Sequence, residues 1–160
     1  MDIIYKPIGI IRSPFKQPKG TAIQSSAAEN IRGTIEIYSE YREGLRDLAG
    51  FSHIILLYHF HLAKEASLIA KPFLDNKFHG IFAIRGPSRP NPIGMSIVNL
   101  INIQENILNV EGIDIVDGTP LLDIKPYIPE FDFRNADRIG WLKKRPGKPA
   151  QTKDDGRFEK

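Results

Sequence analysis

The sequence contains no cysteine, and this absence removes several kinds of chemistry at once. Disulfide frameworks, cysteine-ligated zinc, iron–sulfur clusters and thiol nucleophiles all need that side chain. Any chemistry must therefore come from His, Asp, Glu, Lys, Arg, hydroxyl groups or a bound cofactor.

Long apolar runs are also missing. No stretch approaches the roughly 18 to 20 apolar residues that span a bilayer, and the N-terminus MDIIYKPIGI lacks the basic segment, apolar stretch and cleavage site of a signal peptide. We therefore expect a cytoplasmic protein that does not bind a membrane. The 160 residues, 41% of them apolar and 26% charged, are typical of a soluble chain with one domain.

Charge is unevenly distributed along the chain. Residues 1–133 carry 13 basic and 15 acidic side chains, whereas residues 134–160 carry nine basic and four acidic ones. The basic run in 143–149 has no apolar periodicity and cannot bury enough surface to offset its ordering entropy. We predict a domain over 1–133 and a flexible basic extension over 134–160, which is either a solvated tail or a contact for a polyanion.

Alternation of β-branched and aromatic residues with polar ones predicts about seven strands in a mostly antiparallel β-barrel or sandwich. The predicted strands lie at residues 3–11, 33–38, 52–60, 79–84, 95–103, 107–115 and 121–127. Residues 104–106 are a short polar turn that joins two of these strands as a hairpin. Within 107–115 the apolar face switches at Gly112, which predicts a bulge there.

The helix signals are short. Ser39 can cap a helix over Glu43–Leu48 that stops at Gly50, and Ala63–Ile69 can form two turns before Pro72. Neither is long enough for the crossover of a βαβ unit, and no GxGxxG motif appears. A Rossmann-like methyltransferase or dehydrogenase fold is therefore not expected.

The segment Arg85–Gly94 combines three prolines with two arginines, an asparagine and two glycines. Proline fixes its own φ and restrains the residue before it, so this loop should be stiff. Two guanidinium groups on a preorganised loop are suited to bidentate recognition of a carboxylate or phosphate. The alternative is a rigid connection whose arginines are merely solvated.

A second cluster runs through Asp114–Pro120 and on to Tyr127. Asp-Gly followed by Thr-Pro predicts a tight turn at the end of a strand, with backbone N–H and C=O groups exposed to a ligand. The alternatives are a plain turn and a local ion pair among Asp117, Asp123 and Lys125.

Three histidines, His53, His59 and His61, occupy alternate positions of one predicted strand and should face the same side. An HxH pair is one arrangement of metal ligands, but no Asp or Glu stands at a spacing that completes the set, so no metal site is predicted. His61, at the end of the strand, is better placed at the mouth of a pocket. The long loop after the first strand, residues 14–24, is a second candidate for binding.

Taken together, four ordered segments resemble the TrmO family, also called TsaA-like. The resemblance covers roughly residues 5–132 and is carried by Ile8–Phe15, Phe51–His61, Phe82–Ser96 with its RPNPIG, and Asp114–Tyr127 with DGTPLLDIKPY. Such a family member is expected to fold as a β-barrel unlike other methyltransferases, to form a homodimer and to use S-adenosylmethionine (SAM). The reaction implied is N6-methylation of threonylcarbamoyladenosine beside the anticodon of a tRNA.

Carried over to this sequence, the resemblance implies a set of residues that contact SAM. They are Gln24, His61, Arg85, Arg89, Asp117, Gly118, Thr119 and Pro120, with Leu100 as an apolar contact. The family commonly has Thr-Arg-Ser where this chain has Ile84-Arg85-Gly86, so a hydroxyl contribution there is missing.

Methyl transfer from a sulfonium mainly requires alignment of the nucleophile, methyl group and sulfur at about 3 to 3.5 Å, so little acid–base chemistry is demanded. Asp117 or a backbone carbonyl could accept the proton that the methylated nitrogen gives up, and Asp117 is the candidate side chain. Two other classes of function stay open, and only the first would share all of these motifs. One is a SAM-binding or RNA-binding barrel without turnover, and the other is a small metalloprotein of the HxH type.

Overall fold

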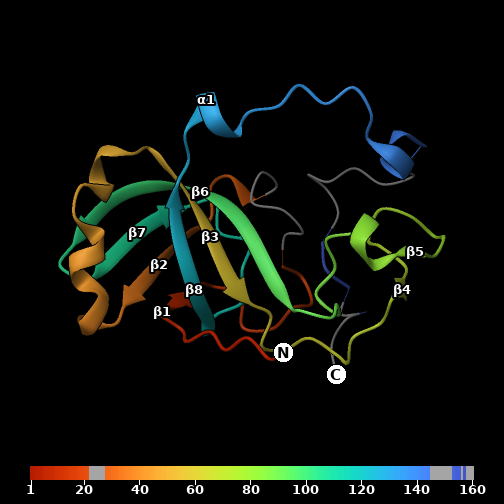
Figure 1. Cartoon of the computed structure of the whole chain (residues 1–160), viewed down its shortest axis with the longest axis horizontal. Helices are drawn as coiled ribbons and strands as arrows, with labels where there is room; N and C mark the ends of the chain where they lie inside the picture. The colour runs from red at the N-terminus through yellow and green to blue at the C-terminus, as the bar shows by residue number, and fades with distance from the viewer. Residues whose placement is uncertain (22–27, 145–152, 156, 158–160) are drawn as a thin grey trace.

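The computed structural model describes residues 1–21, 28–144, 153–155 and 157 (Figure 1). Within them, six strands form a closed antiparallel barrel in the order β1-β2-β7-β6-β3-β8. The bounds are β1 Gly9–Arg12, β2 Arg32–Ile37, β3 His53–His59, β6 Ile93–Gln104, β7 Ile107–Glu111 and β8 Thr119–Pro126. This architecture confirms the predicted mostly β fold and its antiparallel barrel.

The barrel is filled by the apolar side chains that alternate along its strands. In β3, Ile54, Leu56 and Tyr58 are buried while the residues between them are partly exposed. Every strand except β1 and β8 pairs with two neighbours over at least four positions, so closure leaves no long unpaired edge. Each fully buried Ile or Leu stabilises the fold by roughly 1.5 to 3 kcal/mol relative to an exposed one.

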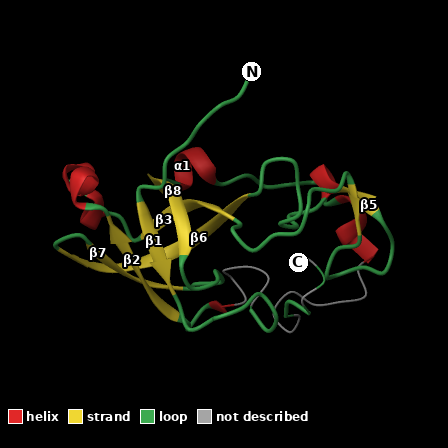
Figure 2. Ribbon diagram, turned by 90° about the horizontal axis from the view of Figure 1, so that it is seen from below, coloured by secondary structure: helices red, strands yellow, loops and turns green. Residues whose placement is uncertain are grey.

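A small lobe stands beside the barrel, as Figure 2 shows for the end that carries β5. It holds the two-stranded sheet of β4 Ile69–Ala70 and β5 His79–Gly80, followed by the 3₁₀ helix Ile81–Ala83. Its own core consists of Ala70, Ile81 and Ile84, with Phe73 packed against them.

Two of the predicted strands, 3–11 and 79–84, keep less than half of their predicted residues. The first begins at Gly9 rather than residue 3, and Ile3, Ile4 and Tyr5 are exposed because that segment pairs with no strand. The strand predicted at 79–84 ends at Gly80, where the chain turns into the 3₁₀ helix that buries Ile81. Residues 3–5 and 81–84 carry a strand signal in their apolar side chains, but no neighbouring strand pairs with them.

The bulge predicted at Gly112 is wrong. β7 ends at Glu111, and Gly112 adopts a φ of 90° that turns the chain out of the sheet. The N–H groups of Gly112 and Ile113 both donate to the carbonyl of Ile31, which closes the ladder. The irregularity lies instead in β6, between Leu100 and Asn102.

The helix predictions are only partly right. The segment after Ser39 forms two 3₁₀ helices, Ser39–Leu45 and Leu48–Gly50, and no side chain caps the first of them. Asp47, with a φ of 66°, separates the two. The segment Ala63–Ile69 forms no helix, and Ile69 belongs to β4.

The segment after β8 crosses from the barrel to the lobe, as the blue trace shows in Figure 1. It begins with α1 Pro129–Asp132 and reaches the 3₁₀ helix Gly140–Lys144. There the Trp141 Nε1–H donates to the carbonyl of Ala83 at 2.8 Å, and its ring stacks on His79 at 4.8 Å between centroids. The flexibility predicted for 134–160 stays a prediction, and residues 145–152, 156 and 158–160 lie outside the described part.

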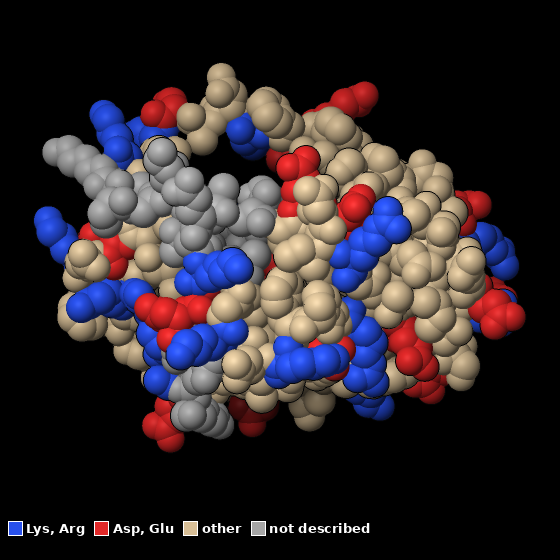
Figure 3. Space-filling view, turned by 180° about the vertical axis from the view of Figure 1, so that it is seen from behind, with Lys and Arg blue, Asp and Glu red and all other residues tan. Residues whose placement is uncertain are grey.

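Charges of both signs are interspersed on the face seen in Figure 3, so no single-sign patch dominates it. None of the helices in the described part is both long and apolar enough to cross a bilayer.

Candidate functional site

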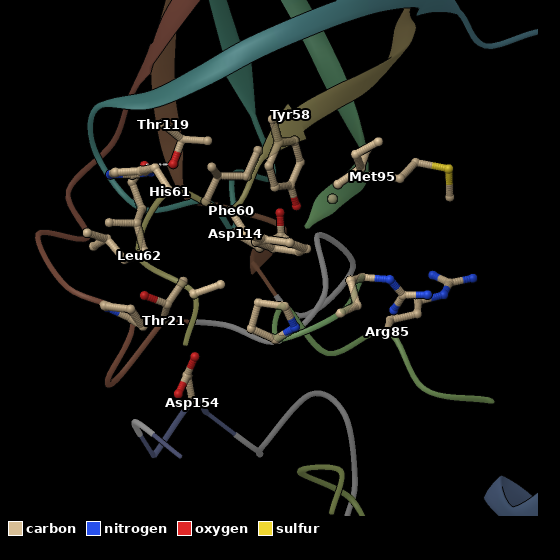
Figure 4. Close-up of a pocket in the computed structure, with 18 of the residues that line it drawn as sticks. Thr21, Tyr58, Phe60, His61, Leu62, Arg85, Met95, Asp114, Thr119 and Asp154 are labelled. Carbon is tan, nitrogen blue, oxygen red and sulfur yellow. Dashed lines mark hydrogen bonds between the residues drawn. The ribbon is translucent and has the colours of Figure 1, made fainter. Parts of the chain in front are cut away.

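A cavity of about 270 Å³ lies where the barrel faces the lobe (Figure 4). It brings together the end of β3, the start of β6, the proline-rich loop before β6 and the loop between β7 and β8. The two clusters singled out in the sequence therefore line the same cavity. Four of the predicted SAM contacts are among its lining residues: His61, Arg85, Arg89 and Thr119.

The proline-rich loop contributes both of its arginines to the cavity wall. Arg89 also holds the loop in shape, because its Nη1 donates to the carbonyls of Ile84 at 2.9 Å and Gly86 at 3.2 Å. The loop is thus stiffened by a side chain as well as by its prolines. A carboxylate or phosphate that entered the cavity would meet two cations held on one preorganised segment.

Gly94, the second residue of β6 after this loop, packs against two aromatic rings. A Cβ atom at this position would overlap the ring of Tyr58 and lie 2.8 Å from Cζ of Phe60. The two rings meet edge to face, with centroids 5.5 Å apart. Glycine is therefore required here for the close approach of the backbone to the apolar wall of the cavity.

The loop between β7 and β8 supplies a carboxylate, Asp114, to the cavity. Its Oδ1 accepts a hydrogen bond of 2.6 Å from Ser96 Oγ, which in turn lies 2.9 Å from the hydroxyl of Tyr58. Burial raises the pKa of Asp114 to about 6, although the bond from Ser96 works against the rise. Burial, followed by the charge of Asp114, also raises the pKa of Tyr58.

Asp117, the candidate acceptor from the sequence, is not among the residues that line the cavity. Its carboxylate accepts a hydrogen bond from the Ser13 N–H at 3.1 Å and pairs with Lys16 at 3.0 Å. Burial acts to raise its pKa, but the hydrogen bonds from Lys16 and Ser13 outweigh this effect and hold the pKa below its usual value.

The backbone N–H groups of the DGTP turn donate hydrogen bonds to carbonyl groups of the chain itself. The N–H groups of Asp117 and Gly118 donate to the carbonyls of Phe15 and Ile11, and the N–H of Thr119 donates to Val116. The turn therefore does not offer these N–H groups to a ligand, contrary to the expectation from its sequence. Its contribution to the cavity comes through Thr119 and the residues before the turn.

The remaining predicted contacts lie elsewhere. Leu100 belongs to the buried core of the barrel, and Pro120 stands in β8, where it faces Ile10 of β1. Neither these two residues nor Gly118 is among those that line the cavity. Gln24 lies outside the described residues.

His61 stands at the cavity wall, as predicted from its place after β3. Burial, and then the neighbouring His59, lowers its pKa. His53 lies at the other end of the strand, where its Nδ1 is 2.9 Å from Ser52 Oγ and its ring contacts Tyr127. In the described part of the chain, no three His, Asp or Glu side chains gather as a metal site would require.

Comparison with known proteins identifies the family to which the chain belongs. Residues 10–133 match the model of the tRNA-methyltransferase O N-terminal domain. The chain belongs to the TrmO family. A crystal structure of TrmO from Pseudomonas aeruginosa superposes with a TM-score of 0.74 at 38% identity, covering 88% of this chain and 63% of that one. The resemblance inferred from the four segments is confirmed.

Two TrmO relatives carry different names. A probable S-adenosyl-L-methionine-binding protein of Pyrococcus abyssi is 57% identical over 98% of this chain and 85% of its own length. The tRNA (adenine(37)-N6)-methyltransferase of Escherichia coli is 37% identical over 78% of this chain, which spans only 57% of that protein.

Sequence reasoning did not find the hydrogen-bonded set of Tyr58, Ser96 and Asp114. All three lie in segments that carried the family resemblance, but no role was assigned to them. One signal was available, because a tyrosine within an apolar strand usually needs a partner for its hydroxyl. Nothing in the sequence pattern indicated which serine and which aspartate would supply it.

Proposed function

We propose that this chain is a SAM-dependent tRNA methyltransferase that methylates N6 of an adenosine next to the anticodon. The observation that carries the proposal is that Arg85, Arg89 and Asp114 line one cavity within a barrel of the TrmO family. The name of the Escherichia coli relative, a tRNA (adenine(37)-N6)-methyltransferase, supports the same reaction.

The residues of the cavity suit SAM. Arg85 and Arg89 provide cations for its carboxylate, and Phe60, Leu62 and Met95 provide apolar surface for its adenosine and methylene groups. The cofactor supplies an electrophilic methyl group on a positively charged sulfur. The cavity supplies orientation, which is the main requirement of an in-line displacement.

The specific adenosine that we propose as substrate is threonylcarbamoyladenosine. This modified base carries a carboxylate of its own, so the ternary complex holds two carboxylates. Two guanidinium groups in one cavity match that number. The assignment is tested with tRNA that carries or lacks the threonylcarbamoyl group.

SAM binding is tested by calorimetry on Arg85→Ala. Loss of a charge-assisted hydrogen bond costs roughly 1.5 to 3 kcal/mol, which is a decrease in affinity of about ten- to a hundredfold. The matched control is Arg46→Ala, since Arg46 is exposed, follows the 3₁₀ helix Ser39–Leu45 outside the cavity and pairs with Glu43 at 3.2 Å. Equal SAM affinity of both variants would exclude Arg85 from the site.

Turnover is tested by incubating the purified chain with tRNA and SAM, followed by mass spectrometry of the tRNA nucleosides. The expected product is an adenosine derivative with one additional methyl group on N6. A second candidate function is SAM binding without turnover, which is favoured by the name of the 57% identical Pyrococcus abyssi relative. SAM binding with no methylated nucleoside would select it.

The chain is also proposed to form a homodimer through the outer face of β6. Ile93, Met95, Ile97 and Ile101 lie at alternate positions of this strand and are 37 to 47% exposed. The first two also line the cavity, so the proposed interface would lie next to the SAM site. We expect Ile97→Glu to convert a dimer into a monomer in light scattering. The control is Ile3→Glu, because Ile3 is exposed in the unpaired N-terminal segment. A wild-type chain that elutes as a monomer would contradict the proposal.

A further inference from the structure

The direction of the hydrogen bonds at the cavity wall follows from the number of protons available. Ser96 Oγ carries one proton and donates it to Asp114 Oδ1 at 2.6 Å. The 2.9 Å bond between Ser96 and Tyr58 must then be donated by the tyrosine hydroxyl. The chain of bonds therefore runs from Tyr58 through Ser96 to Asp114, and both of its ends line the cavity.

We propose that Asp114 is the proton acceptor of the methyl transfer and that Tyr58 and Ser96 are positioning residues that orient its carboxylate. The inference rests on the proposed function and names a residue for which the sequence had suggested Asp117. Asp117 is paired with Lys16 and Ser13 and does not line the cavity, whereas Asp114 does.

The chemistry gives a reason for an acceptor at this place. The exocyclic nitrogen of an adenine, above all one that bears a carbonyl group, delocalises its lone pair and is a weak nucleophile. As the nitrogen–carbon bond forms, the carbon–sulfur bond breaks and its electron pair remains on sulfur. The proton of the nitrogen passes to the Asp114 carboxylate, which becomes a neutral acid and later releases the proton to water.

The surroundings of Asp114 suit this role. The charged and titratable side chains that line the cavity with it are Tyr58, His61, Arg85, Arg89 and Asp154. Asp114 has a pKa of about 6, so its carboxylate is ionised at neutral pH and is more basic than an exposed aspartate. Ser96 occupies one of the roughly four lone-pair directions of the carboxylate, so Asp114 keeps acceptor capacity for a substrate proton.

The alternative is that Tyr58, Ser96 and Asp114 form a hydrogen-bond network that only stabilises the barrel. It predicts a loss of stability or of SAM affinity in variants, but no change in the pH dependence of the chemical step. A catalytic role and a purely structural role of Asp114 therefore predict different rates of methyl transfer in the variants. These rates are measured under single-turnover conditions with saturating SAM.

The decisive experiment compares wild type with Asp114→Asn in single turnover between pH 5 and 9. We expect the rate to fall by about 10² to 10⁴-fold, in the range of a lost general base, while calorimetry shows SAM affinity changed less than threefold. The wild-type rate should decrease below about pH 6, and the variant should lack this step. Glu111→Gln is the matched control, since Glu111 lies on β7 outside the cavity and pairs with Arg32.

Ser96→Ala tests the positioning role and protects the proposal if Asp114→Asn does not fold. The bond from Ser96 lowers the pKa of Asp114, so its removal should shift the pH midpoint of the rate upward. The same shift should appear without cofactor or substrate, as a ¹³C NMR titration of the Asp114 carboxyl near pH 6 in the free chain.

The outcomes separate this inference from the proposed function. If the wild-type chain transfers the methyl group and the rate of Asp114→Asn is within threefold of the wild-type rate, the role of Asp114 is overturned and the proposed function stands. The same holds if the loss of rate is fully matched by a loss of SAM affinity. The absence of methyl transfer by the wild-type chain would remove the proposed function and this inference together.

Discussion

Single residues of the proline-rich loop determine the shape of the cavity. Arg89 holds the loop through the carbonyls of Ile84 and Gly86, and Gly94 lets the backbone approach the rings of Tyr58 and Phe60. The motif RPNPIG therefore combines a binding cation with residues that are needed for geometry. Substitutions at these positions should act on stability and on SAM binding together.

Gly94→Ala should destabilise the protein. The new methyl group would overlap the Tyr58 ring and lie 2.8 Å from Phe60 Cζ, and overpacking of this kind costs typically about 1 to 3 kcal/mol. In a chain of this size each kcal/mol lowers Tm by roughly 2 to 4 °C, which calorimetry can measure. Gly44→Ala is the matched control, because a Cβ there meets no atom within 4 Å. Equal Tm values for the two variants would contradict the packing argument.

Asp114 should make the stability of the cofactor-free chain depend on pH. Burial raises its pKa in the folded state to about 6, above its ordinary value of 3.8, so the folded chain binds the proton more tightly than the unfolded one. The free energy of unfolding should therefore decrease by on the order of 2 kcal/mol as the pH rises from about 4 to 6. In urea titrations, Asp114→Asn should lack this component, and identical pH profiles would argue against the raised pKa.

At the scale of elements, the barrel strands could be predicted because burial on one face gives each of them a period of two. Ile54, Leu56 and Tyr58 show that period plainly in β3. The lobe could not be predicted, since β4 and β5 have two residues each and pair nine and eleven positions apart. Short nonlocal pairs of this kind leave too little pattern to recognise.

The choice between Asp114 and Asp117 shows the same limit within the site. Both belong to one segment, and the sequence indicated that this segment reaches the cavity. The strand ends at Glu111 and Gly112 turns the chain, so alternation no longer tells which side chain points inward. Only the contacts with Ser96 and Lys16 distinguish the two carboxylates.

The contact between the extension and the lobe should contribute measurably to stability. Trp141→Phe keeps an aromatic ring beside His79 but loses the hydrogen bond to the Ala83 carbonyl, a change of about 1 kcal/mol. Hydrogen exchange should show faster opening of the lobe amides in the variant, with the barrel amides unchanged. Tyr5→Phe, at an exposed position of the N-terminal segment, is the control.

At the scale of the whole molecule, the chain joins a nearly neutral barrel to a basic extension. Residues 134–160 carry nine basic and four acidic side chains. Asp154 of this extension lines the cavity, and its backbone exchanges hydrogen bonds with Gly20 and Thr21. A deletion of the extension would therefore disturb the cavity as well as remove charge, and substitution is the cleaner test.

Replacing Lys143, Lys144, Arg145 and Lys148 by Gln should weaken tRNA binding and leave SAM binding intact. Each phosphate contact that is lost lowers the slope of log affinity against log salt concentration by roughly 0.7 to 0.9. Filter binding over a series of salt concentrations measures that slope. Arg42→Gln with Arg46→Gln removes exposed charges from the barrel side and is the control. An unchanged slope in the extension variant would mean that the extension is only a solvated tail.

The position of Trp141 between the extension and the lobe has a practical consequence. It is the sole tryptophan of the chain, and it lies where the extension touches the lobe, stacked on an imidazole. Indole emission from the unmodified protein therefore arises from this junction alone. Its intensity and wavelength give a built-in optical readout of whether the extension stays docked or lifts away when RNA is added.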